Sequence, residues 1–205
     1  MRTSMLLLIL ISAMSCINQK PKVDLHTAVV TDNLEIIKQH IKAATDLNVL
    51  EPSRKSSPLI TAAAAGKTEA ARLLINAGAD LNIQNADGST ALHTAAVFGN
   101  DEIAQQLIDA GSDLNLKNND GATALHVSAF FCRLEIVKAL IAKGADTSIK
   151  NSRGHTALET VEAPFEMMQP AYDAVAAGLK PLGVTLDYEQ IKTARPQIAE
   201  LLTKG

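Results

Sequence analysis

The sequence predicts an all-α fold, a solenoid of stacked helix-turn-helix units that ends in a C-terminal helical cap. The stretch DGSTALHTAAVFGN at residues 87–100 returns as DGATALHVSAFFCR at residues 120–133, so the offset is 33 residues. Both copies place an Asp-Gly turn before apolar residues at helical spacing. Because one copy is too short to bury its apolar face alone, the copies are expected to stack on one another.

The repeat extends over residues 24–163. Residues 56–85 keep the same apolar and glycine columns, and residues 24–49 fit with an offset one residue longer. Residues 151–160 begin a fifth copy, after which the pattern drifts away. The sequence therefore predicts four full repeats and a partial fifth.

Within each repeat, local signals predict two short helices. Thr90 and Thr123 stand where a helix N-cap is needed, and Gly111 stands where the residue after a helix adopts a left-handed conformation. The leucines that recur at one column of each helix are expected in the stacked core; they are Leu92, Leu107, Leu125 and Leu140. Cys132 occupies the column of the turn glycine, and we expect a small buried residue there.

The last part of the chain, residues 164–205, departs from the repeat and predicts the helical cap. Apolar residues at three-to-four spacing predict one helix over residues 165–183. Asp187 is expected to cap the next helix, and Pro196 is expected to begin a last short one. A partner-binding appendix is the alternative interpretation of this segment.

The motifs TALHTAA at residues 90–96 and TALHVSA at residues 123–129, followed by GSDLN and GADTS, resemble ankyrin repeats. Ala91 and Ala124 stand where that family usually has proline. The resemblance implies that the repeated histidines hydrogen-bond between neighbouring turns, and that the repeated aspartates and asparagines bind local backbone. These residues are His26, His93 and His126, then Asp80, Asp113, Asp146, Asn82 and Asn115.

The N-terminus has a composition of its own. Residues 1–15 combine an early arginine with a short apolar run, which predicts a signal peptide. AMSC at residues 13–16 resembles the lipobox of bacterial lipoproteins, so Cys16 is the predicted lipidation site and residues 16–23 form a tether. Ile17 favours the outer membrane, with the protein in the periplasm. Ordinary secretion and an uncleaved anchor remain alternatives.

Composition and motifs argue against several function classes. The formal net charge of −3 and the pI near 5.9 argue against a nucleic-acid partner. The sequence carries no metal-binding or catalytic motif that we can name, so we expect no cofactor, no metal and no enzyme activity. We expect a monomer.

The predicted partner-binding residues follow from the resemblance, because ankyrin repeats usually bind through hairpin tips and the exposed side of the first helix. Three of the four phenylalanines lie in the two columns before the turn. Phe130 is expected to be exposed, so its truncation should weaken binding and hardly change stability. For Phe98 and Phe131, packing under the loop between helices is the alternative interpretation. The full predicted set is Val97, Phe98, Phe130, Phe131, Asn119, Asp120 and Arg153.

These observations favour a non-catalytic protein-interaction scaffold of the bacterial cell envelope, which binds its partner through the concave face of the repeats. Two alternatives remain open. One is a dedicated inhibitor or immunity protein for a single enzyme. The other is an enzyme or ligand carrier that uses the C-terminal segment.

Overall fold

The computed structural model describes residues 21–204, and in this range the chain is all-helical. Four helix pairs come first, and a single helix, α10, opens a fifth unit. The pairs are α2 (Leu25–Val30) with α3 (Leu34–Lys42), α4 (Pro58–Ala65) with α5 (Thr68–Asn76), α6 (Ala91–Phe98) with α7 (Asp101–Asp109), and α8 (Ala124–Phe130) with α9 (Leu134–Ala142). After α10 (Ala157–Glu162) come α11 (Phe165–Leu179), the short 3-10 helix η1 (Lys180–Leu182) and α12 (Tyr188–Lys204).

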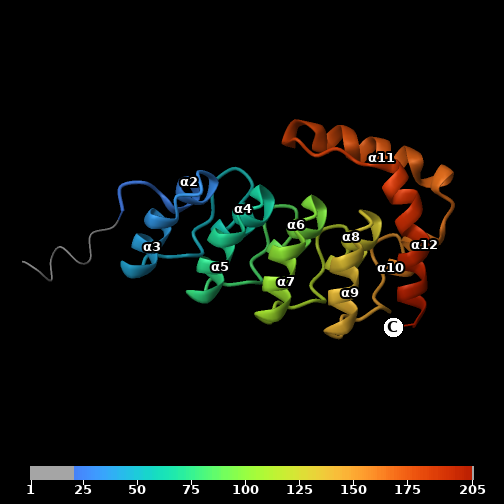
Figure 1. Cartoon of the computed structure of the whole chain (residues 1–205), viewed down its shortest axis with the longest axis horizontal. Coiled ribbons are helices and arrows are strands. Elements are labelled where there is room, and N and C mark those ends of the chain that lie inside the picture. Colours follow the sequence, from blue (N-terminus) through green and yellow to red (C-terminus); the bar gives the residue numbers. More distant parts are fainter. Residues whose placement is uncertain (1–20, 205) are drawn as a thin grey trace, which may run out of the picture.

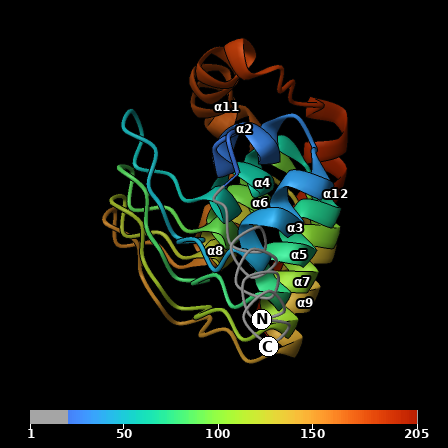
Figure 2. The same cartoon turned by 90° about the vertical axis from the view of Figure 1, so that its left-hand side faces the viewer.

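The helix pairs stack side by side into an elongated solenoid (Figure 1). The first helices, α2, α4, α6, α8 and α10, form one row, and the second helices form the other. The loops that join one pair to the next project together from one side of the stack (Figure 2). The predicted solenoid of paired helices is therefore confirmed.

The local signals for helix ends behave as predicted. Thr90 caps α6, because its hydroxyl accepts a hydrogen bond from the His93 N–H, and Thr123 caps α8 in the same capping-box arrangement. Gly111 follows α7 with φ of +88°. Cys132 has φ of +55° and is buried, which explains why neighbouring repeats place glycine in that column.

The core runs the length of the stack. Leu92, Leu107, Leu125 and Leu140 are each 1% exposed or less, which confirms the predicted register of the repeats. Alanines fill the close contacts between the first helices, among them Ala62, Ala95 and Ala129, which are fully buried. Small side chains at these positions let the short helices approach one another closely.

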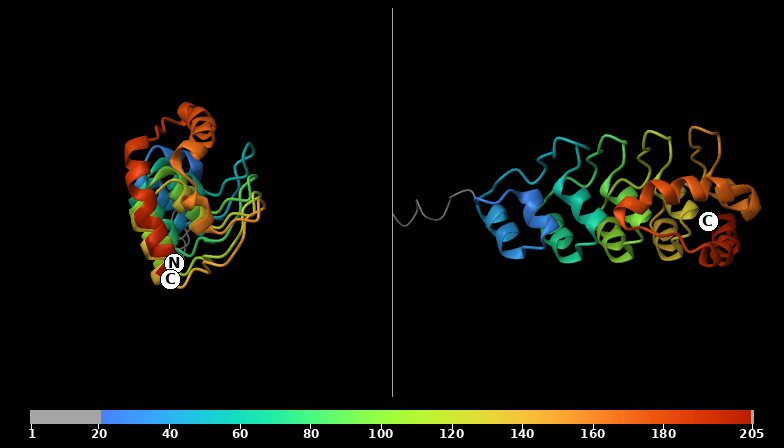
Figure 3. Two further views of the ribbon diagram at one scale, coloured as in Figure 1. Left: turned by 90° about the vertical axis from the view of Figure 1, so that its right-hand side faces the viewer. Right: turned by 90° about the horizontal axis from the view of Figure 1, so that it is seen from above.

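The C-terminal segment is more closely integrated with the repeats than a simple cap. Helix α12 packs against α10 and α9, and so takes the place that a second helix has in the preceding pairs. In the sequence, α11 stands between α10 and α12. In space, it runs back along the stack over the end of α8 (Figures 1 and 3). The fifth repeat is thus completed by residues that lie beyond the point where the sequence pattern fades.

The expectation that Pro196 begins a separate helix is wrong, because α12 continues through it from Tyr188 to Lys204. Proline lacks the N–H that would bond to the carbonyl of Lys192, so it normally disfavours a helix interior. Pro196 itself is exposed, while Ala194 and Ile198 on either side of it are buried. Packing on both sides of the proline holds the two halves in line.

The predicted signal peptide, Cys16 and most of the tether lie outside the described residues. Over residues 21–204, no helix combines the length and apolar character needed to cross a membrane.

Candidate protein-binding surface

The loops between repeats are built on repeated aspartate and asparagine side chains. The Asp80 carboxylate accepts a hydrogen bond from the Asn82 N–H, and the Asn82 side chain accepts one from the Asp113 N–H of the next repeat, both at 2.9 Å. The same two contacts recur between Asp113, Asn115 and Asp146. These side chains bind backbone, as predicted, and join each loop to the next.

The tips of the hairpin loops are also joined to one another. Backbone N–H groups of Ala86, Asn119 and Ser152 donate to carbonyls one repeat earlier, those of Arg54, Asp87 and Asp120, at 2.8–3.1 Å. The Asn119 side chain adds a hydrogen bond to the Ala86 carbonyl at 3.0 Å. We call residues 54–55, 85–88, 118–121 and 151–154 the tip row. Its backbone is fixed by these contacts.

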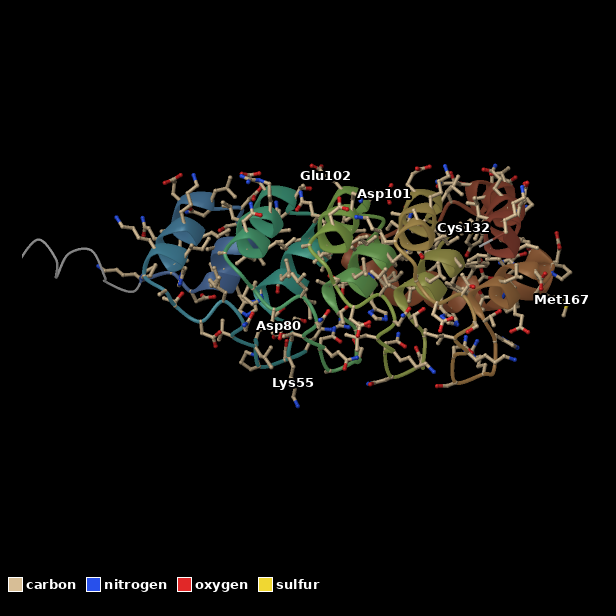
Figure 4. The ribbon with its side chains drawn as sticks, turned by 90° about the horizontal axis from the view of Figure 1, so that it is seen from below. Lys55, Asp80, Asp101, Glu102, Cys132 and Met167 are labelled. Atoms are coloured by element: carbon tan, nitrogen blue, oxygen red, sulfur yellow. The ribbon has the colours of Figure 1, made fainter. Side chains whose placement is uncertain are left out.

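The predicted tip residues lie at the solvent-exposed surface, where the Asn119 side chain also contacts the preceding tip. Asn119, Asp120 and Arg153 are all exposed. Figure 4 shows Lys55 of the tip row and Asp80 on the loop side of the molecule, whereas Asp101 and Glu102 of α7 lie on the opposite side. The tip row is therefore a separate surface from that of the second helices.

The expectation that Phe130 is exposed is wrong. Its ring stacks on Tyr172 of α11, with the centroids 4.6 Å apart, and the Tyr172 hydroxyl donates to the Phe130 carbonyl at 2.9 Å. Phe131 meets Phe130 edge to face at 5.1 Å, and both rings are half-buried. Helix α11 thus covers part of the surface that the sequence assigned to a partner.

The two predicted residues of α6 are also only partly accessible. Val97 and Phe98 are half-buried, and the Val97 carbonyl accepts a hydrogen bond from Arg133 of the next repeat at 3.1 Å. The largest exposed apolar side chain at this end of the first helices is Val30 of α2, which is 55% exposed. The phenylalanines before the turn between the two helices of a repeat therefore contribute to packing within the protein.

Sequence reasoning missed the polar cluster beneath α11. Arg195 of α12 is 4% exposed, and its Nη1 donates to the Tyr172 hydroxyl at 2.8 Å while Nη2 donates to the Ala163 carbonyl. Burial raises the pKa of Tyr172 to about 12 and that of Cys132 to about 11. Cys132 is therefore a protonated packing residue. The aromatic residues within 165–188 are the one sequence signal that could have indicated this cluster.

The repeated histidines link neighbouring repeats. The Thr90 N–H donates to Nδ1 of His93, so Nε2 carries the proton and donates to the Ala122 carbonyl at 3.0 Å. His126 repeats the arrangement with the His155 carbonyl at 3.1 Å. Burial lowers the pKa of both imidazoles, so they are neutral. Within residues 21–204, no group of three or more potential metal ligands comes together.

Stacked helix pairs, an ordered row of hairpin tips and alanine-rich contacts define a helical-repeat scaffold. The family model described as ankyrin repeats (3 copies) matches residues 25–118 and 98–161, and the chain belongs to the ankyrin-repeat family. This membership indicates protein–protein interaction. No curated protein matches the chain.

Proposed function

We propose that the chain is a non-catalytic interaction scaffold that binds a protein partner through the tip row. The observation that carries this proposal is the ladder of hydrogen bonds between tips, which fixes the backbone while Asn119, Asp120 and Arg153 stay exposed to solvent. A surface that is ordered before binding loses little conformational entropy when a partner docks, so more of the contact energy becomes affinity.

The chemistry of the tip row supports a polar, orientation-sensitive contact. Asp120 and Arg153 bring opposite charges on neighbouring repeats. Such charges favour encounter with a complementary partner and disfavour wrong ones. Val97 and Phe98 are the last two residues of α6, and they add partly exposed apolar area on the row of first helices.

The proposed location is the bacterial cell envelope. The apolar run that ends in AMSC supports a lipid anchor at Cys16, with the scaffold in the periplasm at the outer membrane. Labelling with a fatty acid should mark the protein, and Cys16→Ser should abolish the mark. Unchanged labelling of that variant would exclude Cys16 as the anchor.

Site-specific photo-crosslinking tests the binding surface. A photoreactive phenylalanine analogue at position 120, whose side chain is exposed, should yield an adduct with a partner in envelope extract. The same analogue at position 102, on the exposed surface of α7, is the matched control and should not. Equal adducts at both positions, or an adduct at 102 alone, would contradict the proposal.

A further inference from the structure

An open pocket of about 480 Å³ lies at the end of the solenoid, where α10 and α12 meet the first residue of α11. Its apolar wall includes Val161, Phe165 and Pro196, and its charged wall includes Lys192 and Arg195. This volume lies in the range of small-molecule sites, which typically combine apolar walls with a few charged groups. The pocket is remote from the tip row.

Arg195 is a buried cation without a carboxylate partner. Its hydrogen bonds go to the Tyr172 hydroxyl and to the carbonyls of Ala163 and Thr160, and no ion pair in residues 21–204 includes it. Neutral oxygens accept three hydrogen bonds from Arg195 but leave a full positive charge uncompensated, which is unusual for a buried charge.

Two N–H groups of Arg195, that of Nε and one of Nη1, have no acceptor among the described residues. No protein group accepts a hydrogen bond from Nε, yet this atom is not among the buried polar atoms without a partner in the described residues. Nε therefore keeps some contact with solvent, and Arg195 is one of the residues that line the pocket. The uncompensated charge faces a cavity that can hold an anion.

Lys192 lies one helical turn before Arg195 and adds a second positive charge to the same pocket. Its Nζ is 5.1 Å from the centre of the Phe165 ring and 2.8 Å from the carboxylate of Glu189, whose side chain is 82% exposed. An exposed pair of this kind is weak, so a ligand can share Nζ. The pocket wall also holds one carboxylate, that of Glu162, so the lining carries two positive charges and one negative.

We propose that this pocket binds a small organic monoanion, a carboxylate attached to an apolar body. The carboxylate contacts Arg195 and Lys192, and the apolar body packs against Phe165, Val161 and Pro196. Glu189 and Glu162 already offset part of the positive charge of Lys192 and Arg195, so a single negative charge suits the site and a more highly charged ligand is disfavoured. This site goes beyond the proposed scaffold function and does not depend on it.

Titration of ¹⁵N-labelled protein with benzoate, followed by NMR, tests the site, with benzamide as the neutral analogue of equal shape. We expect shift changes confined to α10, the start of α11 and α12. The dissociation constant should be on the order of 1 mM, as ligand efficiency allows for so small a molecule. Benzamide should bind at least about fivefold more weakly, because it lacks the charge. Equal binding of the two, stronger binding of inorganic phosphate, or no localised shifts would overturn the proposal.

Two exposed positions provide opposite controls that should keep the fold. Lys192→Gln removes a positive charge from the pocket and should weaken benzoate binding several-fold, whereas Glu162→Gln removes the negative charge and should strengthen it. Far-UV circular dichroism and thermal unfolding confirm that each variant is folded. If either variant binds benzoate as the unaltered protein does, the assignment is wrong.

Discussion

Tyr172 makes three contacts that hold α11 on the repeats. Its ring stacks on Phe130, its hydroxyl donates to the Phe130 carbonyl, and the same hydroxyl accepts from Arg195. A buried hydroxyl that is used both as donor and acceptor is costly to remove, because its former partners stay behind in a water-poor site.

Tyr172→Phe should therefore lower the free energy of unfolding by about 1–3 kcal/mol, since it leaves a carbonyl and a guanidinium without their partner. Chemical denaturation measures the loss. Tyr188→Phe is the matched control, because that hydroxyl donates to the exposed Asp173 and its loss should cost less. Equal losses for the two variants would mean that the cluster under α11 contributes nothing particular to stability.

The buried histidines give stability a defined pH dependence. Burial holds the pKa of His93 and His126 below the ordinary 6.5, so the unfolded chain binds protons at a higher pH than the folded one. The free energy of unfolding is then at its full value above pH 6.5 and falls as the pH decreases through 6.5 towards the folded pKa values.

Denaturant unfolding at pH 7.5 and at pH 5.5 tests this sign. The unaltered protein should be less stable at the lower pH. The double variant His93→Gln with His126→Gln should lose less between the two conditions, because glutamine can still accept the capping hydrogen bond but does not titrate in this range. A difference between the two pH values that is unchanged in the double variant would show that other groups cause it.

Among the elements, the hairpin tips are closely stacked on one another. A Cβ added at Gly88, where φ is +70°, would lie 2.7 Å from the backbone nitrogen of Asn119 in the next repeat. Gly111 also has a positive φ, of +88°, but no atom lies within 4 Å of such a Cβ. Both glycines have a positive φ, which other residues adopt only with strain. Only Gly88 also lies too close to the next repeat for a Cβ.

Gly111→Ala should cost about 1 kcal/mol from backbone strain alone, and Gly88→Ala should cost roughly 1–3 kcal/mol more from overpacking. Thermal and denaturant unfolding of both variants separate the two terms. Similar losses would show that the tips can move apart easily, and the idea of a pre-ordered tip row would lose its support.

Helix α12 should behave as the second helix of a repeat. Ile198 is fully buried in α12, so Ile198→Ala should cost about 2–5 kcal/mol, as a core truncation does. Leu182→Ala, in the exposed η1, should cost little. A small loss at Ile198, measured by reversible denaturation, would indicate that α12 is a loosely attached appendix.

The repeats could be predicted from the sequence because each is specified locally. A Thr-x-x-His motif, a turn glycine and three or four apolar residues determine a helix and its neighbour within a few turns of chain. The contact between Phe130 and Tyr172 spans 42 residues and has no such signal. The insertion of α11 also separates α10 from α12 in the sequence. The 33-residue period is therefore lost there, although α12 packs against α10 as the second helix of a repeat would. The exposed tips were predicted correctly because they are turns, whereas the accessibility of Phe130 depended on this distant helix.

At the scale of the whole molecule, the tip row, the aromatic cluster and the charged pocket lie on different surfaces of the solenoid. The tip row presents polar side chains on an ordered backbone, and the aromatic cluster fixes the C-terminal helices to the last repeats. The charged pocket lies at the far end, between α10 and α12. Because contacts in a solenoid are mainly between neighbours, a change at one of these surfaces should leave the others largely intact.

Paired measurement of partner affinity and unfolding free energy for Asp120→Lys and Phe130→Ala tests the central claim most directly. Asp120→Lys reverses an exposed charge of the tip row, so it should weaken binding about tenfold or more and change stability by less than about 0.5 kcal/mol. Phe130→Ala should destabilise the fold by about 2–4 kcal/mol and leave the affinity of the folded protein nearly unchanged. The reverse outcome, with affinity lost at Phe130 and unaffected at Asp120, would contradict the account and return the binding site to the aromatic residues.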